Sequence, residues 1–222
     1  MPEPLVLPQY GPTLPEIARR RFGLRERTTA VLLLVLAALI ALGLFVVRPQ
    51  VDPLAKYVHH GDPTFNLLYR RSALHKVPPQ ESELVRLQGQ RGRLTTTIAV
   101  EPLKLPAATG DIAHGALPAF ASRHIEELRA GDDTFQLVAE GRARVNGAPG
   151  YEVRFRTGPP GKQTFGNDLL ILPKEDDATG ALLVTSRRTI TGKPTLGKRE
   201  AALNKASAKA YRSFKYGATA AS

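Results

Sequence analysis

The sequence FQLVAEGRARVNGAPGYEVRFR, residues 135–156, carries the clearest strand signal in the chain. Apolar and polar residues alternate on both sides of the turn-forming segment NGAPG at residues 146–150. A period of two is typical of half-buried strands, and an Asn-Gly pair between two such runs is typical of a hairpin. We therefore predict an antiparallel hairpin that turns at residues 146–150.

The charges of this hairpin predict a register in which Val145 lies opposite Tyr151. Two pairs of opposite charge then face each other across the strands, Arg144 with Glu152 and Glu140 with Arg156. Such cross-strand pairs stabilise a sheet. The same register places four arginines on one face: Arg142, Arg144, Arg154 and Arg156. This face either binds an anion or is simply solvated, and the alternation of charges favours the solvated face.

On either side of the hairpin, similar patterns predict further strands and two helices. The strands fall at residues 64–69, 83–88, 93–101, 169–172 and 181–184, and the second turns into the third at residues 89–92. One helix begins near Leu117, because Pro118 is tolerated in a first turn, and another covers residues 198–216. These elements predict an α+β fold, an antiparallel β-sheet with flanking helices, over residues 64–217.

The sequence offers few residues for catalysis or metal binding. It contains no Cys, which excludes thiol nucleophiles and thiolate metal sites. His59, His60 and Asp62 lie close together, but they lack a spacing typical of metal ligands and no second cluster follows. No known catalytic motif occurs either. We therefore predict no catalytic residue, no metal and no cofactor.

Two further features have a functional and a structural interpretation. His124 lies at the centre of the apolar face of the helix near Leu117, where it is either an acid–base group or a packed side chain; a single His without a partner motif favours packing. The segment TGPPGK, residues 157–162, resembles a phosphate loop. Because Pro159 and Pro160 lack the N–H groups that would hold a phosphate, we predict no nucleotide binding.

The net charge of +11 is concentrated at the C-terminal end of the chain. Residues 48–186 carry 17 basic and 16 acidic groups, whereas residues 187–222 carry nine basic groups and one acidic group. A nearly neutral body and few aromatic residues make nucleic-acid binding an unfavoured interpretation. The charge instead belongs to the C-terminal segment, which contains the last predicted helix.

That last helix is amphipathic. Its predicted apolar face consists of Leu203, Ala206, Ala210 and Phe214, at helical spacing. Its opposite face carries four cations: Lys205, Lys209, Arg212 and Lys215. One interpretation is that these cations face an anionic surface, either lipid headgroups or a cell-wall polymer. The sequence slightly favours the alternative, a solvated helix face that only keeps the domain soluble.

Residues 29–47, TAVLLLVLAALIALGLFVV, predict a single transmembrane helix. These 19 residues carry no charge, and a helix of this length spans the ~30 Å core of a bilayer. A cleaved signal peptide is the alternative, but it predicts a shorter apolar region with a small-residue cleavage site after it. Five arginines precede the segment and few cations follow it, which predicts a cytoplasmic N-terminus and an external domain.

The remaining segments are predicted to lack a core of their own. Residues 1–28 are expected to form a disordered, Pro-rich cytoplasmic tail, residues 48–63 a juxtamembrane linker, and residues 218–222 a disordered tail. Arg outnumbers Lys 21 to 10, and no Asn-x-Ser/Thr sequon occurs. Both facts are typical of a bacterial envelope protein.

Three phrases of the external domain resemble the PsbP-like family: AVEPLKLP at residues 99–106, VNGAPGYEVRF at residues 145–155 and TFGNDLLILP at residues 164–173. That family includes the extrinsic subunit of plant photosystem II and many bacterial lipoproteins and membrane-anchored proteins. The resemblance implies an antiparallel sheet with helices packed against it and a binding or assembly role without catalysis. A membrane anchor in place of the usual lipobox is a departure from the pattern, and no functional residue of the family is carried over.

The sequence as a whole favours a non-enzymatic, membrane-anchored binding or scaffold module on the extracytoplasmic side of a bacterial membrane. Its protein partner is not identified by any motif. The alternative is an envelope hydrolase whose active-site residues are dispersed in sequence and meet only in the fold. A pocket that joined His124 or His114 to a carboxylate and a hydroxyl would favour that alternative.

Overall fold

The computed structural model describes residues 31, 34–40, 53–105, 112–176 and 178–217. The chain divides into two compact units, Met1–Val51 and Asp52–Ser222. In the first unit, residues 34–40 are helical. No helix among the described residues is long and apolar enough to cross a membrane. Much of the predicted spanning segment, at residues 29–30, 32–33 and 41–47, lies outside the described residues, as do both predicted tails, residues 1–28 and 218–222.

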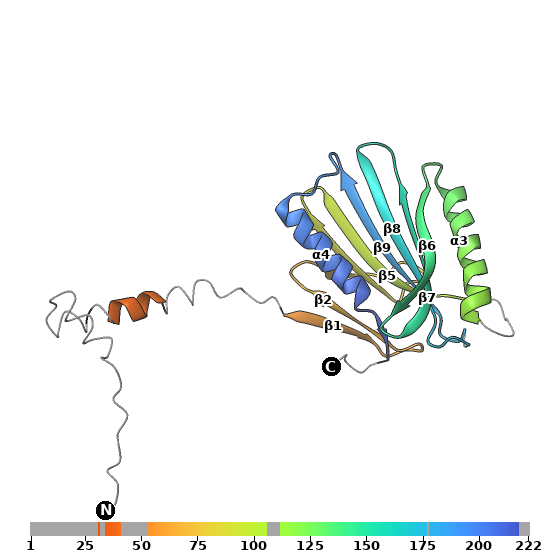
Figure 1. The fold of residues 1–222 in the computed structure, drawn as a ribbon, viewed down its shortest axis with the longest axis horizontal. Helices are drawn as coiled ribbons and strands as arrows, with labels where there is room; N and C mark the ends of the chain where they lie inside the picture. Colours follow the sequence, from red (N-terminus) through yellow and green to blue (C-terminus); the bar gives the residue numbers. More distant parts are fainter. Residues whose placement is uncertain (1–30, 32–33, 41–52, 106–111, 177, 218–222) are drawn as a thin grey trace, which may run out of the picture. The chain divides into compact units, whose positions relative to one another are not determined.

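The second unit is an α+β domain whose paired strands are all antiparallel (Figure 1). Its larger sheet has seven strands in the order β3-β4-β5-β9-β8-β7-β6, and its smaller sheet has the order β1-β2-β10. The larger sheet consists of β3 (His75–Val77), β4 (Val85–Arg91), β5 (Leu94–Pro102), β6 (Gln136–Val145), β7 (Ala148–Thr157), β8 (Lys162–Ile171) and β9 (Leu182–Thr191). The smaller sheet consists of β1 (Leu54–His59), β2 (Phe65–Arg70) and β10 (Lys215–Tyr216).

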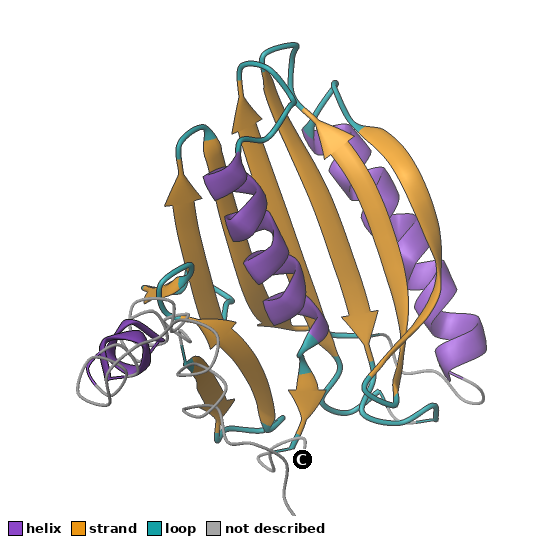
Figure 2. Ribbon diagram, turned by 60° about the vertical axis from the view of Figure 1, so that its left-hand side comes forward, coloured by secondary structure: helices purple, strands orange, loops and turns teal. Residues whose placement is uncertain are grey.

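Two long helices cover opposite faces of the larger sheet (Figure 2). Helix α3 (Leu117–Gly131) follows a short π-helical segment, η1 (Ile112–Ala116), and packs against β6 and β7. Helix α4 (Lys198–Arg212) packs against β2, β4, β5 and β9. Each face has its own cluster of buried side chains, and we call them the α3 face and the α4 face. The predicted α+β fold with an antiparallel sheet and flanking helices is therefore confirmed.

The central strands are buried on both faces, as their continuous apolar runs predicted. Leu169 and Ile171 belong to the cluster under α4, whereas Leu170 and Leu172 belong to the cluster under α3. Successive side chains of a strand point to opposite faces, so one run of four apolar residues supplies both clusters. The sheet between the two helices is consequently the core of the domain.

The hairpin at residues 136–157 forms, but its predicted register is wrong. Val145 lies opposite Ala148 instead of Tyr151, so the turn contains only two residues. Asn146 and Gly147 both have positive φ, at 50° and 88°. A two-residue turn with positive φ at both residues matches the right-handed twist of the two strands, and this favours it over the predicted five-residue loop. In the observed register, Arg144 does not lie opposite Glu152, and Glu140 does not lie opposite Arg156, so the predicted charge pairs are not formed.

The two-residue turn also places the arginines of β6 and those of β7 on opposite faces of the hairpin, and a separate irregularity, a bulge, lies further along β6. The register shifts between Leu137 and Ala139, which leaves Val138 as an extra residue. Arg142 lies opposite Tyr151, a residue packed against the α3 cluster. Arg154 instead lines a hollow beside α4. The single arginine-bearing face that the sequence predicted therefore does not exist.

Other differences concern strand β1 and the end of helix α4. Strand β1 lies inside the predicted linker at residues 48–63, and pairs with β2 along its whole length. Helix α4 ends at Arg212 rather than near residue 216, because Ser213 accepts a hydrogen bond from the N–H of Leu68 at 2.8 Å and donates one to its carbonyl at 3.1 Å. The chain then continues as β10, whose pairing with β2 the sequence did not predict.

Removal of β1 should destabilise the domain, and this is testable with two fragments, residues 53–217 and 61–217. In the longer one, β1 supplies a six-residue ladder to β2, and Tyr57 lies against the buried Phe65 with ring centroids 6.1 Å apart. We expect the shorter fragment to unfold at a clearly lower temperature in circular dichroism. Equal unfolding temperatures would instead support the linker predicted from the sequence.

Candidate functional site

An open groove of about 590 Å³ runs beside α4, where the helix faces the last residues of β2 and β4. Five cations line it, and no carboxylate does. They are Arg70 from β2, Arg91 from β4, and Arg199, Lys205 and Lys209 from α4. We call this surface the basic groove.

The helical period places three of these cations on one side of α4. On this side of the helix, Ala202 and Ala206 lie between Arg199, Lys205 and Lys209. The small alanine side chains leave the floor of the groove open. Leu203 is buried beneath them and holds this part of the helix against the sheet. The side chains of the cations therefore remain at the surface while the helix itself is fixed.

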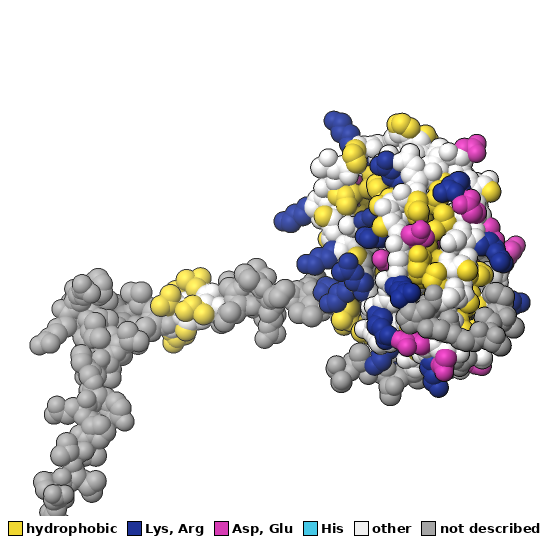
Figure 3. Space-filling model, turned by 45° about the vertical axis from the view of Figure 1, so that its right-hand side comes forward, with side chains coloured by type: hydrophobic (Ala, Val, Ile, Leu, Met, Phe, Trp, Pro, Cys, Tyr) yellow, Lys and Arg dark blue, Asp and Glu magenta, His cyan; other side chains and the backbone are white. Residues whose placement is uncertain are grey.

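The charges of the basic groove are not compensated by neighbouring carboxylates. Among the residues that the structure describes, none of the five cations forms a salt bridge. Arg91 donates hydrogen bonds to the main-chain oxygens of Ser72 and Gln90, at 2.6 and 2.9 Å, which orient it without neutralising it. Over much of the face in Figure 3, by contrast, basic and acidic side chains lie interspersed. A concave, single-sign surface attracts anions.

The structure brings together only two of the four cations that the sequence placed on one surface. Lys205 and Lys209 lie in the basic groove. Arg212 lines a different hollow on the other side of α4, and Lys215 is half-buried on β10, opposite Asn66. Helical periodicity could have added Arg199 to the first two. Arg70 and Arg91 carried no such signal, because only the packing of both sheets against α4 brings them there.

On the α3 face, His124 meets a buried carboxylate. Its Nε2 donates to Oδ2 of Asp168 over 2.8 Å, since a carboxylate can only accept. Arg187 donates to both oxygens of the same carboxylate, with Nη2 3.0 Å from Oδ2, and its guanidinium lies 4.8 Å from the Phe155 ring centroid. Asp168 is 0% exposed. The cluster thus joins α3 to β8 and β9.

The electrostatics of this cluster favour a fixed negative charge on Asp168. Burial raises the pKa of Asp168, but the hydrogen bonds from His124 and Arg187 and the charge of Arg187 outweigh it, so the pKa lies below its ordinary value of 3.8. Within the described part of the chain, no hydroxyl lies within hydrogen-bond distance of His124. Among the described residues, this cluster thus joins a histidine to a carboxylate without the hydroxyl that a triad would add.

The other histidines that the sequence analysis considered do not join this cluster. His59 stacks on Phe65, with ring centroids 5.0 Å apart, while His60 and Asp62 are exposed. The side chain of His114 lies outside the described residues. Groups of three or more His, Asp or Glu that could hold a metal ion do not occur among the side chains that are described. Residues 157–162 form the turn between β7 and β8, so no helix follows them as a phosphate loop would require.

Comparison with known proteins returns similar structures only. No family profile and no curated protein matches the chain. The solution structure of cyanobacterial PsbP (CyanoP) from Synechocystis sp. PCC 6803 is 11% identical, with 77% of this chain and 96% of that chain covered and a TM-score of 0.49. The crystal structure of LpqN, involved in cell envelope biogenesis of Mycobacterium tuberculosis, is 16% identical, with 73% and 91% covered and a TM-score of 0.45. These similarities are low in both sequence identity and TM-score, and they assign no function to this chain.

Replacement of Asp168 by Asn should destabilise the domain, on the order of 3 kcal/mol at neutral pH, because Arg187 then loses its buried partner. Asp168 has a lowered pKa in the folded state, so its stabilising effect is present above the unfolded pKa and is lost as pH falls through the folded pKa. The difference in unfolding temperature between the wild type and Asp168→Asn should therefore shrink as pH falls below about 4. A difference independent of pH would contradict the ionised carboxylate.

Proposed function

We propose that this chain is a membrane-tethered, non-enzymatic binding module whose α+β domain lies outside the cytoplasm and holds an anionic lipid surface in its basic groove. The observation that carries the proposal is the groove itself, which presents five cations without a carboxylate. Such a surface attracts headgroup phosphates, and each cation close to an anionic membrane contributes about 1 kcal/mol.

The proposed tether keeps the domain close to such a surface. If residues 29–47 span the bilayer, only six residues separate them from the first residue of β1, Leu54. A fully extended chain covers at most ~3.6 Å per residue, so the domain begins within about 25 Å of the membrane. Electrostatic attraction at physiological ionic strength reaches only ~8 Å, and a short tether therefore matters for binding.

The proposed orientation follows from the arginines that precede the tether. Basic residues near a spanning helix tend to remain in the cytoplasm, and five arginines lie within residues 19–27. The basic groove would then meet the outer leaflet of that membrane. A cell-wall polymer is the other anionic surface within reach there, and the experiments below separate the two.

Neutralisation of the groove should abolish binding of the isolated domain, residues 53–217, to anionic vesicles. We expect cosedimentation with vesicles that contain phosphatidylglycerol at low ionic strength and release as salt rises, because exposed charges are screened. The variant Arg70→Gln, Arg199→Gln, Lys205→Gln, Lys209→Gln should lose most of this binding, as all four side chains line the groove.

A matched control keeps the same net charge change but leaves the groove intact: Arg123→Gln, Arg142→Gln, Lys162→Gln, Lys193→Gln. These four side chains are exposed and do not line the groove. The control should retain vesicle binding. If both variants lost vesicle binding equally, the effect would be one of net charge alone, and the proposal would be contradicted. If the unaltered domain bound isolated cell walls but not vesicles, the partner would be a wall polymer.

The topology is tested separately with protease added to intact protoplasts that express the full chain. Digestion should remove the domain and spare a tag at the N-terminus, because the arginines before the tether hold that end inside. Protection of the domain would contradict the proposed orientation. A mature protein that begins near Arg48 would show a cleaved signal peptide instead of a tether.

A further inference from the structure

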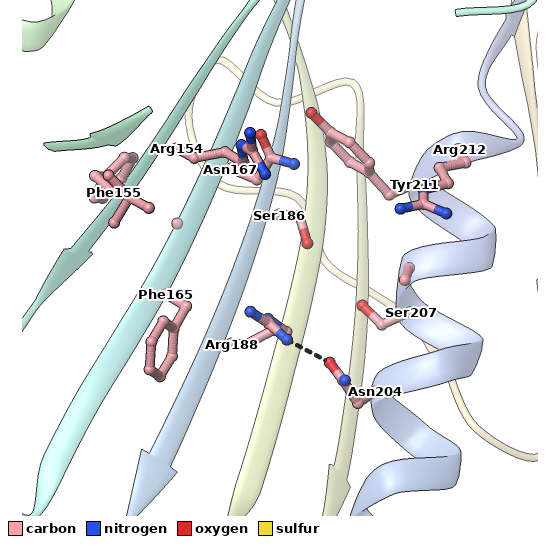
Figure 4. Close-up of a pocket in the computed structure, with 13 residues that line it drawn as sticks. Arg154, Phe155, Phe165, Asn167, Ser186, Arg188, Asn204, Ser207, Tyr211 and Arg212 are labelled. Atoms are coloured by element: carbon pink, nitrogen blue, oxygen red, sulfur yellow. Dashed lines mark hydrogen bonds between the residues drawn. The ribbon is translucent and has the colours of Figure 1, made fainter. Parts of the chain in front are cut away.

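A second hollow, of about 320 Å³, lies on the other side of α4, between that helix and the α4 face of β7, β8 and β9 (Figure 4). We call it the α4 hollow. It is separate from the basic groove, with which it shares no lining residue. Its lining combines aromatic rings, amides, hydroxyls and three arginines but no carboxylate. This mixture of a few polar groups with apolar surface is typical of small-molecule sites, and the volume is at the lower end of their range.

Two buried polar atoms in the α4 hollow lack a hydrogen-bond partner. They are Oδ1 of Asn167 and the hydroxyl oxygen of Tyr211, and no other buried side-chain oxygen or nitrogen of the described residues is unpartnered. Tyr211 is 6% exposed, and its hydroxyl points from α4 toward Asn167 and Arg154 (Figure 4). Buried polar groups in folded proteins are almost always paired. Two such oxygens on residues that line the same hollow suggest a ligand that forms the missing hydrogen bonds.

The orientation of Asn167 determines which partner it needs. Its Nδ2 donates to Oε1 of Glu152 at 2.9 Å, and a carboxylate only accepts, so the amide cannot be flipped without losing this bond. Oδ1 is therefore an acceptor without a partner beside the hollow, and because this atom is itself buried, the lining must shift slightly for a ligand to reach it. The ligand must supply a hydroxyl or N–H donor at this position.

Arg188 determines the charge of the ligand. It is half-buried, yet its partners are Oδ1 of Asn204, at 2.7 Å, and the ring of Phe165, whose centroid lies 5.4 Å from the guanidinium. Burial lowers the pKa of Arg188, and among the described residues this guanidinium forms no salt bridge. Arg212 is exposed at the rim of the same hollow. An anionic group on the ligand would compensate these charges.

The spacing of the two groups sets the size of the ligand. Asn167 lies opposite Ser186 in the sheet, and Arg188 follows Ser186 by two residues on the same face of β9. Two residues along a strand span about 7 Å. The donor and the anionic group of the ligand are therefore several bonds apart.

We propose that the α4 hollow binds a small hydroxy carboxylate, whose carboxylate pairs with Arg188 and whose hydroxyl donates to Oδ1 of Asn167 beside the hydroxyl of Tyr211. Citrate has this chemistry and serves as the probe. Tricarballylate carries the same three carboxylates without the hydroxyl, and triethyl citrate carries the hydroxyl without the charges.

Calorimetric titration of the full chain in neutral detergent tests the proposal. Citrate should bind, tricarballylate should bind about tenfold more weakly or worse, and triethyl citrate should not bind, because a site built for a hydroxyl discriminates against its absence. Arg188→Gln and Tyr211→Phe should each weaken citrate binding. Lys205→Gln, Lys209→Gln should leave it unchanged, which separates this site from the basic groove.

Tyr216→Phe is the matched control for Tyr211→Phe. The hydroxyl of Tyr216 already donates to main-chain oxygens of Ile171 and Gly180, at 2.9 and 3.0 Å, so its loss should lower the unfolding temperature without affecting citrate. The loss of the unpaired Tyr211 hydroxyl should affect citrate without lowering the unfolding temperature. No binding of citrate at millimolar concentration, or equal binding of citrate and tricarballylate, would overturn the proposal and leave the hollow filled by water alone.

Discussion

The attachment of α4 to the sheet is the constraint on which both binding surfaces depend. The helix is hydrogen-bonded to the sheet near its start, in its middle and just beyond its end. Glu200 accepts the N–H of Arg93 at 2.9 Å, Ser207 shares a buried hydrogen bond of 2.6 Å with Thr96, and Ser213 bonds the backbone of Leu68. Leu203 and Ala210 fill the space between these points. A helix held in this way cannot roll, and its two flanks keep separate surroundings.

These two flanks suit different ligands because they differ in depth and in how far their charged side chains are buried. The basic groove is lined by exposed cations from α4 and from the ends of β2 and β4, where long-range attraction acts and salt competes. The α4 hollow contains a half-buried Arg188 and two buried unpartnered oxygens, where desolvated contacts give specificity. One helix thus supports a broad electrostatic surface and a narrow polar site.

Local patterns predicted most elements of the domain, because alternation and helical period need only neighbouring residues. The buried run at residues 169–172 and the helix that begins at Leu117 are confirmed in this way. The bulge at Val138 and strand β1 belong to local hairpins, but no alternation or turn signal marked them. The pairing of β10 with β2 joins segments far apart along the chain, and the sequence did not predict it. The same holds for the sites. The charges of α4 were visible in the sequence, but their neighbours Arg70 and Arg91 come from strands far away along the chain.

The central claim is that the two flanks of α4 are independent anion-binding surfaces, and nuclear magnetic resonance of the isotope-labelled domain tests it most directly. The measurement follows amide shifts during titration with soluble short-chain phosphatidylglycerol and, separately, with citrate. We expect the lipid to shift amides around Arg70, Arg91 and Arg199, and citrate to shift amides around Asn167 and Arg188. Shifts confined to the α3 face, or one common set of shifts for both ligands, would contradict the account.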